Sequence, residues 1–267
     1  MSKGGFLGVE DTARKVKDIY VGVNGVARKA VKGYVGDGDG IARQFWPGAE
    51  AGPDFSFTVS GSAAFTWAFY AITFTGTIDW GDGTSDSNVS HSYAPGTYIV
   101  KLYGALTNIS FQECAALTEV LQPFPASMAA QTNCRAIFNG CAGLTTIPAH
   151  LFDACTAAVA FSGCFRYCSS LAAIPEGLFD YCPSVTIFAT CFQGCSSITG
   201  IPSGLFDRCP LVTSFASCFK DCTSVTEIPE GLFSNCPLVT RFDSCFYGCS
   251  SLCSSSRKCI KRAPRST

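Results

Sequence analysis

The sequence has little of what most catalytic or nucleic-acid-binding proteins need. Only two histidines, His91 and His150, occur in 267 residues, and neither has a nucleophile at a spacing typical of a catalytic triad. The formal net charge is -1, with 15% charged residues, whereas a nucleic-acid-binding protein needs a dominant basic face. We therefore expect a protein that is not an enzyme and does not bind nucleic acid.

Long apolar runs are also missing. No stretch reaches the roughly 18 to 20 apolar residues that a membrane-spanning helix requires. The opening residues, MSKGGFLGVEDTARKVK, lack the apolar centre of a secretion signal. We expect neither a signal peptide nor membrane insertion, and therefore thiols that stay reduced in the cytoplasm.

What the sequence does contain is an internal repeat of 27 residues. Four copies align without gaps from Leu144, Leu171, Ile198 and Val225, and a weaker copy starts at Leu117. Phe111 and Cys114 keep the same register, so we expect the array to begin near residue 111. One coil of this length cannot bury its own apolar face, so the copies must stack as a solenoid.

Each copy is expected to form two short strands, LTxIP and VTxF, because apolar and Thr residues alternate there. GLFDxC and CFxGC space their apolar residues as one helical turn does. Stacking then places equivalent residues in ladders that form the core. These ladders are Cys168, Cys195, Cys222 and Cys249; Phe165, Phe192, Phe219 and Phe246; and Leu151, Leu178, Leu205 and Leu232.

The fold class we expect is mainly β with short helical turns. Strand-like runs separated by Gly, Ser, Asn and Pro predict a small antiparallel β-sandwich. Asn24-Gly25 and Asp39-Gly40, between apolar runs, predict two β-hairpins. The predicted domains are hairpins at 1–48, a linker at 49–54, the sandwich at 55–104, the solenoid at 105–252 and a basic tail at 253–267.

Three groups of residues could carry chemistry. The CxxxC pairs, such as Cys164 with Cys168, could be packed thiols, disulfides or metal ligands, and regular repetition favours packing. Asp79, Asp82 and Asp86 could hold calcium, but the WGDG turn explains them better. The recurring acids Asp153, Asp180 and Asp207 are expected to have a local structural role. We expect no cofactor and no metal site.

The motif FxGCSSLTxIPxGLF, present with small changes at residues 192–206, resembles the BspA-like leucine-rich repeats of bacterial surface and phage proteins. IDWGDGTS and HSYAPGTYIVKLYG, within residues 78–104, resemble a PKD-type immunoglobulin-like domain. The duplicated YVGVNGVARK element resembles segments at the start of phage and prophage tail-associated proteins. None of these resemblances carries a catalytic residue to this chain.

Together the resemblances imply a structural protein of a phage or prophage tail. It would be made in the bacterial cytoplasm and act in the virion, as a homo-oligomer within an assembly. The N-terminal segment would attach to other virion proteins, and the solenoid would bind a host surface protein or glycan. The alternative is a bacterial cell-surface adhesin of the same repeat family, located on the cell surface or outside the cell.

If the solenoid binds a partner, its variable positions should do so, because the ladder positions are used by the core. Two series of variable positions are expected to form exposed stripes, and an ordinary solvated surface is the alternative interpretation. The first stripe is Arg166, Gln193, Lys220 and Tyr247, and the second stripe is Ala154, Tyr181, Arg208 and Asn235.

Overall fold

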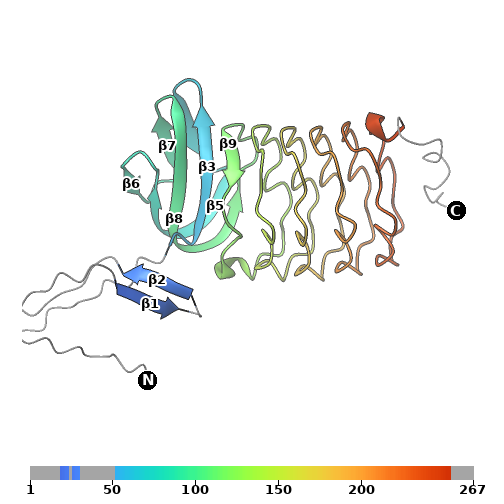
Figure 1. Cartoon of the computed structure of the whole chain (residues 1–267), viewed down its shortest axis with the longest axis horizontal. Helices are drawn as coiled ribbons and strands as arrows, with labels where there is room; N and C mark the ends of the chain where they lie inside the picture. The colour runs from blue at the N-terminus through green and yellow to red at the C-terminus, as the bar shows by residue number, and fades with distance from the viewer. Residues whose placement is uncertain (1–18, 24–25, 31–51, 254–267) are drawn as a thin grey trace, which may run out of the picture. The chain divides into compact units, whose positions relative to one another are not determined.

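The computed structural model describes residues 19–23, 26–30 and 52–253 (Figure 1). The chain divides into two units, residues 1–52 and 53–267. Among the described residues there is no α-helix, and strands alternate with turns as expected for a mainly β protein. Two 3-10 helices occur, η1 (Ala126–Met128) and η2 (Ser250–Cys253). No helix in these described ranges is long and apolar enough to span a membrane.

The first unit contains an antiparallel hairpin formed by β1 (Ile19–Val23) and β2 (Val26–Ala30). Val23 is paired with Val26, so the strands on either side of the predicted turn pair with each other. The first of the two predicted hairpins is therefore present. The second one, around Asp39-Gly40, lies outside the described residues, as do half of the predicted linker and most of the basic tail.

The second unit begins with two antiparallel sheets. The larger sheet has the strand order β6-β5-β8-β3-β9, and the smaller sheet pairs β4 with β7. The strands are β3 (Phe55–Gly61), β4 (Phe65–Ala68), β5 (Ala71–Asp79), β6 (Ser85–Asp86), β7 (Ser90–Tyr93), β8 (Gly96–Ser110) and β9 (Leu117–Val120).

Aromatic side chains join the two sheets. Along β3, Phe55, Phe57 and Val59 are fully buried, as the alternation of apolar and polar residues in FSFTVS requires. The ring of Phe57 lies 5.2 Å from that of Trp67 on β4, measured between centroids. Phe111, the first residue after β8, packs edge-on against Phe57 at 5.0 Å. One core thus continues from the sheets into the repeats.

The predicted boundary at residue 104 is wrong. β8 continues to Ser110, which pairs with Ala71 at the start of β5, so residues 105–110 belong to the sheet. Gly104 indicates a strand end in the sequence, but it is instead paired with Gly76 on β5. A Cβ on either glycine would collide with the backbone of the opposite strand, so this close crossing requires glycine on both sides.

The repeats follow the sheet directly and form what we call the coil stack, residues 111–252 (Figure 1). β9 belongs to the first coil and pairs with β3 on one side. On its other side, Glu119 forms a parallel bridge with Thr146 in the second coil. The first coil therefore covers the sheet edge that β3 would otherwise leave open.

Successive coils are joined by backbone hydrogen bonds between residues one repeat apart. Parallel bridges connect Asn133, Ala160, Ile187, Ser214 and Arg241, each 27 residues after the last. The predicted strands are thus confirmed only in part. Apart from β9, the described LTxIP and VTxF segments form no continuous strand, because tight turns follow at once, as in the Cys164 N–H bond to Phe161.

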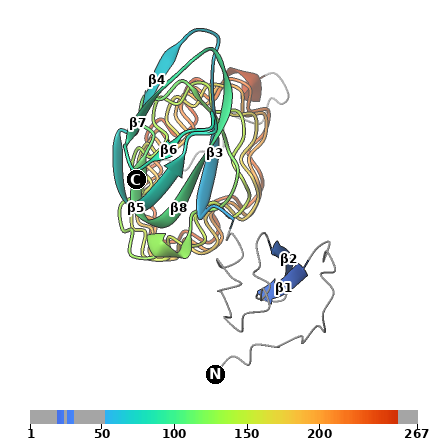
Figure 2. The ribbon, with the colours of Figure 1, turned by 90° about the vertical axis from the view of Figure 1, so that its left-hand side faces the viewer.

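The predicted ladders form the core of the stack, and viewed from the sheet end the coil outlines superimpose (Figure 2). The rings of Phe165, Phe192, Phe219 and Phe246 stack with centroids 5.4 Å apart and nearly parallel planes. The ladder cysteines and leucines are also buried, with exposed fractions of 6% or less. Each ladder residue therefore packs against the same type of residue in the neighbouring coil, which explains the abundance of Phe and Cys.

Candidate binding surface on the coil stack

The ladder thiols have a definite structural role. The Sγ atoms donate to a phenylalanine carbonyl oxygen of the preceding coil, at 3.0 Å in Cys141 to Phe111 and Cys195 to Phe165, and 3.1 Å in Cys168 to Phe138. Burial raises the pKa of Cys195 to about 12. Because a thiol is nucleophilic only as a thiolate, these side chains act as small apolar residues with a weak hydrogen-bond donor.

The thiols of the CxxxC pairs are buried in the same way as the other ladder thiols. Burial raises the pKa of Cys164 and of Cys168 well above the ordinary range. In the described ranges, no group of three or more His, Cys, Asp or Glu side chains is arranged to hold a metal ion. The packing interpretation of the repeated cysteines therefore has direct support in the hydrogen bonds of the ladder.

The carboxylates of the WGDG segment are used within their own turn, as the sequence predicts. Asp82 accepts from the backbone N–H of Thr84 at 3.0 Å and from its hydroxyl at 2.6 Å. Asp86 accepts from the indole N–H of Trp80 at 2.9 Å. The hydrogen bond from Trp80, followed by those from Asn88, lowers the pKa of Asp86. The hydrogen bonds from Thr84, together with the one from His91, lower the pKa of Asp82 to about 2.

The two histidines also have local partners. His91 Nε2 lies 2.7 Å from a carboxylate oxygen of Asp82, and its ring stacks on Trp80 with centroids 5.0 Å apart. His91 is therefore held in place by local contacts. His150 is exposed, and its Nδ1 lies 3.2 Å from Asp153. Burial raises the pKa of Asp153, and this ion pair opposes the shift.

The first stripe is not uniformly exposed. Tyr247 is 68% exposed, and Arg166 and Lys220 are half-buried. Gln193 is only 7% exposed, so its predicted place on an open surface is wrong. Gln193 lies between the long side chains of Arg166 and Lys220 in the adjacent coils, and such side chains cover what lies between them.

The stripe also includes ordered contacts between cations and aromatic rings. The guanidinium carbon of Arg166 lies 4.5 Å from the ring centroid of Tyr167, and Arg166 Nη2 donates to the Tyr167 hydroxyl at 2.9 Å. Lys220 Nζ lies 5.6 Å from the ring centroid of Tyr247 in the next coil. These contacts hold the cations in place over rings that remain open to solvent, since Tyr167 is 45% exposed.

Tyr167 was missed by the sequence prediction, and its backbone is unusual. It has a φ of 60°, a left-handed conformation that is rare for a bulky residue. The equivalent residues Gly140, Gly194 and Gly248 are glycines at φ of 75–77°. Their recurrence in alternate coils is the sequence signal that could have identified this position as left-handed.

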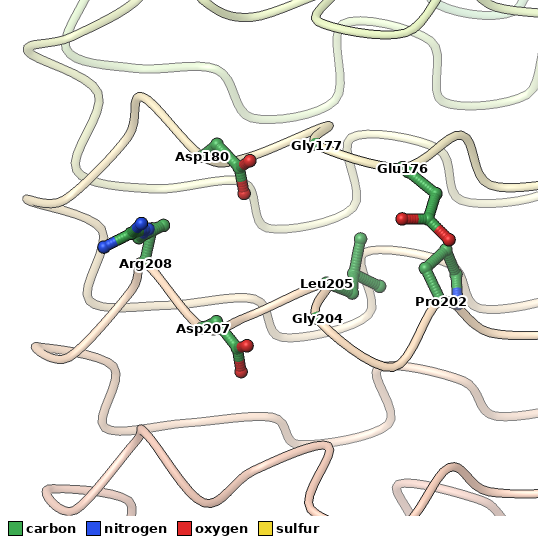
Figure 3. Close-up of a pocket in the computed structure, with 8 residues that line it drawn as sticks. All are labelled: Glu176, Gly177, Asp180, Pro202, Gly204, Leu205, Asp207 and Arg208. Carbon is green, nitrogen blue, oxygen red and sulfur yellow. The ribbon is translucent and has the colours of Figure 1, made fainter.

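The second stripe runs beside a groove between two adjacent coils (Figure 3). Tyr181 is 55% exposed, Arg208 and Asn235 are exposed, and Ala154 is half-buried. The groove has a volume of about 230 Å³. Glu176 and Pro202 lie at one end of it and Arg208 lies at the other (Figure 3). Its walls are completed by Gly177, Asp180, Gly204, Leu205 and Asp207.

The acids of the groove belong to the predicted ladder of aspartates. Asp180 and Asp207 point in the same direction from neighbouring coils (Figure 3). Asn235 Nδ2 donates to Asp207 Oδ1 at 3.0 Å, so one aspartate is tied to the coil beyond it. The backbone N–H of each groove aspartate also bonds to a glycine carbonyl three residues earlier. This supports the structural role that the regular spacing predicts.

The surface of the coil stack therefore presents both polar and aromatic side chains. The buried thiols of the stack and the carboxylates of the WGDG turn are engaged in hydrogen bonds. No family model, no curated protein and no solved structure matches this chain.

Proposed function

We propose that this chain is a structural protein of a phage or prophage tail, whose repeats bind a protein or glycan on the host surface. In this proposal residues 55–110 are a PKD-like, Ig-like module, and the coil stack is a BspA-like leucine-rich-repeat solenoid. The N-terminal segment attaches the chain to other virion proteins, within a homo-oligomeric assembly.

One observation carries the proposal. The core positions of the stack hold the same residue type in coil after coil, while Tyr181, Arg208, Lys220 and Tyr247 differ between coils and reach solvent. A repeat scaffold of this kind keeps its surface residues in fixed relative positions. Exposed Tyr and Arg side chains are the types that contribute most to recognition surfaces.

The chemistry of the other residues is consistent with a binding role. The cysteines hydrogen-bond between coils and have raised pKa values. Both histidines pair with a local aspartate. The residues that most often carry catalysis are thus engaged in structure, and recognition is the function that the geometry supports best.

Localisation in a culture of the bacterium that carries the gene would test this proposal. An antibody raised against residues 111–252 should label the tail of released particles in electron micrographs, and the chain should co-sediment with those particles. Labelling of the cell surface, without particles, would instead support the adhesin alternative. A chain confined to the cytosol would overturn both.

A further inference from the structure

We propose that Arg166, Tyr167, Lys220 and Tyr247 form a binding site for a linear polysaccharide with one anionic group on every second sugar ring. The inference rests on the proposed binding function of the coil stack, and it names both the site and the chemical class of the ligand. We call these four residues the cation–tyrosine edge.

The first argument is the backbone of Tyr167. Its φ of 60° is costly for a bulky L-residue, and glycine occupies the equivalent position in the next coil, at Gly194. The repeat therefore has an easier residue for this position. Glu113 and Asp221 occupy the equivalent position of other coils at the same φ of 60°, so the conformation belongs to the repeat, and Tyr167 is the residue that places an aromatic ring there. Tyr167 has a ring that is 45% exposed.

The second argument is preorganisation. Arg166 contacts Tyr167 twice, through the ring face at 4.5 Å and through the hydroxyl at 2.9 Å. Arg166 Nε is buried and has no hydrogen-bond partner. The guanidinium is thus fixed before a ligand arrives, and less conformational entropy is lost when it binds one. A fixed guanidinium next to an open ring suits a ligand with both a carboxylate and an apolar face.

The third argument is spacing. Phe165, Phe192 and Phe219, next to the stripe, stack at 5.4 Å per coil. Arg166 and Lys220 are two coils apart, which corresponds to roughly 11 Å at this stacking distance. An extended sugar chain advances by about one coil spacing per ring. A chain lying along the stack would therefore bring every second ring to a cation.

The rings of the edge provide the remaining contacts. Tyr247 is 68% exposed and lies one coil beyond Lys220, with the Lys220 ammonium 5.6 Å from its centroid. Exposed aromatic faces pack against the C–H groups of sugar rings, and the phenol hydroxyl can exchange hydrogen bonds with sugar hydroxyls. Cations and rings thus occur together at both ends of the edge.

The acidic side chains near the cation–tyrosine edge do not neutralise its two cations. The carboxylate of Asp221 lies over Gly248 in the next coil, and Asp243 pairs with Arg241 at 3.0 Å. Neither Arg166 nor Lys220 has an ion pair with a described acid. Both cations therefore remain available to a carboxylate of a ligand.

The test is calorimetric titration of the full chain with two probes of equal length. One probe is a hyaluronan oligosaccharide, which has one carboxylate for every two sugars, and the other is a neutral N-acetylglucosamine oligomer. We expect hyaluronan to bind and the neutral oligomer to bind at least about tenfold more weakly, because charge-assisted bonds are lost. Added salt should weaken hyaluronan binding.

Three variants sharpen the test. Arg166→Ala with Lys220→Ala should weaken hyaluronan binding about tenfold or more. Tyr167→Gly should do the same while its melting temperature stays within a few degrees of the parent, because glycine suits a left-handed φ. Tyr70→Ala is the matched control, since Tyr70 is 66% exposed but lies between β4 and β5, outside the coil stack.

The outcomes separate this inference from the proposed function. Absence of hyaluronan binding, equal binding of both probes, or an equal loss in Tyr70→Ala would each overturn the polysaccharide site. The particle labelling described above does not depend on any of these results. Conversely, hyaluronan binding that is weakened by Arg166→Ala with Lys220→Ala and by Tyr167→Gly would support the site even if the chain were found on cell surfaces.

Discussion

The ring of Tyr167 occupies the space in which a side chain of Gly194 would have to lie. A Cβ built on Gly194 falls 2.5 Å from Cδ1 of the Tyr167 ring. The same relationship recurs two coils apart, where Glu113 lies over Gly140 and Asp221 over Gly248. Coils with a side chain at this position thus alternate with coils that have glycine, because stacked coils leave room for one side chain per pair.

This relationship predicts the effect of Gly194→Ala. The alanine must adopt a φ near +75° and displace the Tyr167 ring, so we expect a loss of about 2–4 kcal/mol in the free energy of unfolding. In the background of Tyr167→Gly the collision disappears, and the same substitution should cost only about 1–2 kcal/mol. Denaturant titration of the four proteins measures both values. Equal losses in the two backgrounds would contradict the account.

The phenylalanine column predicts a large effect at its centre. Phe192 is fully buried and stacks at 5.4 Å on Phe165 and Phe219, so Phe192→Ala should cost about 3–5 kcal/mol in stability. The matched control is Phe246→Ala, because Phe246 belongs to the same column but is only partly buried. We expect it to cost at most about half as much. Thermal or denaturant melts measure the loss of stability in both variants, and equal losses would contradict this prediction.

The buried thiols predict loss of stability in alkali. Burial raises the pKa of Cys195, Cys209 and Cys245 to about 12, above the ordinary value of 9.0. The folded chain therefore holds more thiol protons than the unfolded chain between pH 9 and pH 12, and its stability must fall as the pH rises through this window.

Reaction with a thiol reagent gives a second measurement of the same property. At pH 8 the thiols of the coil stack should react slowly in the folded protein and rapidly in denaturant, because the thiolate is scarce and buried. Cys114, which is less buried than the ladder thiols, is expected to react first. Fast labelling of Cys195 in the native protein would contradict the packing account.

The WGDG turn predicts the opposite dependence in acid. The Thr84 hydrogen bonds hold the pKa of Asp82 at about 2, below its ordinary 3.8. Its contribution is therefore complete above pH 4 and is lost as the pH falls towards 2. Asp82→Asn should lower stability at pH 7 and make the decline between pH 4 and pH 2 shallower. Melting curves across this range measure the pH dependence of stability. The same dependence in Asp82→Asn as in the parent would contradict this prediction.

Repetition explains why much of the fold could be predicted. The 27-residue period places Cys168 near Cys195 and Phe165 near Phe192 in any stack of equal coils, and the structure confirms that all four are buried. The Asn24-Gly25 hairpin and the WGDG turn are local, so their residues carry the necessary information.

The predictions that failed concern residues whose neighbours are distant in sequence. The continuation of β8 to Ser110 depends on pairing with Ala71 on β5, and Gln193 is only 7% exposed in a coil that has neighbours on both sides. Most of the strands predicted for the coils are reduced to single bridges, because the backbone N–H groups that follow donate hydrogen bonds within the next turn.

The sequence by itself therefore determined the period, the composition of the core ladders and the local turns, because each of these depends on residues within one coil or one hairpin. Only the tertiary structure decided which variable residues reach solvent. It also placed Arg166 over the ring of Tyr167 and Lys220 over the ring of Tyr247. The exposure and partners of a side chain depend on what the coils before and after it leave open.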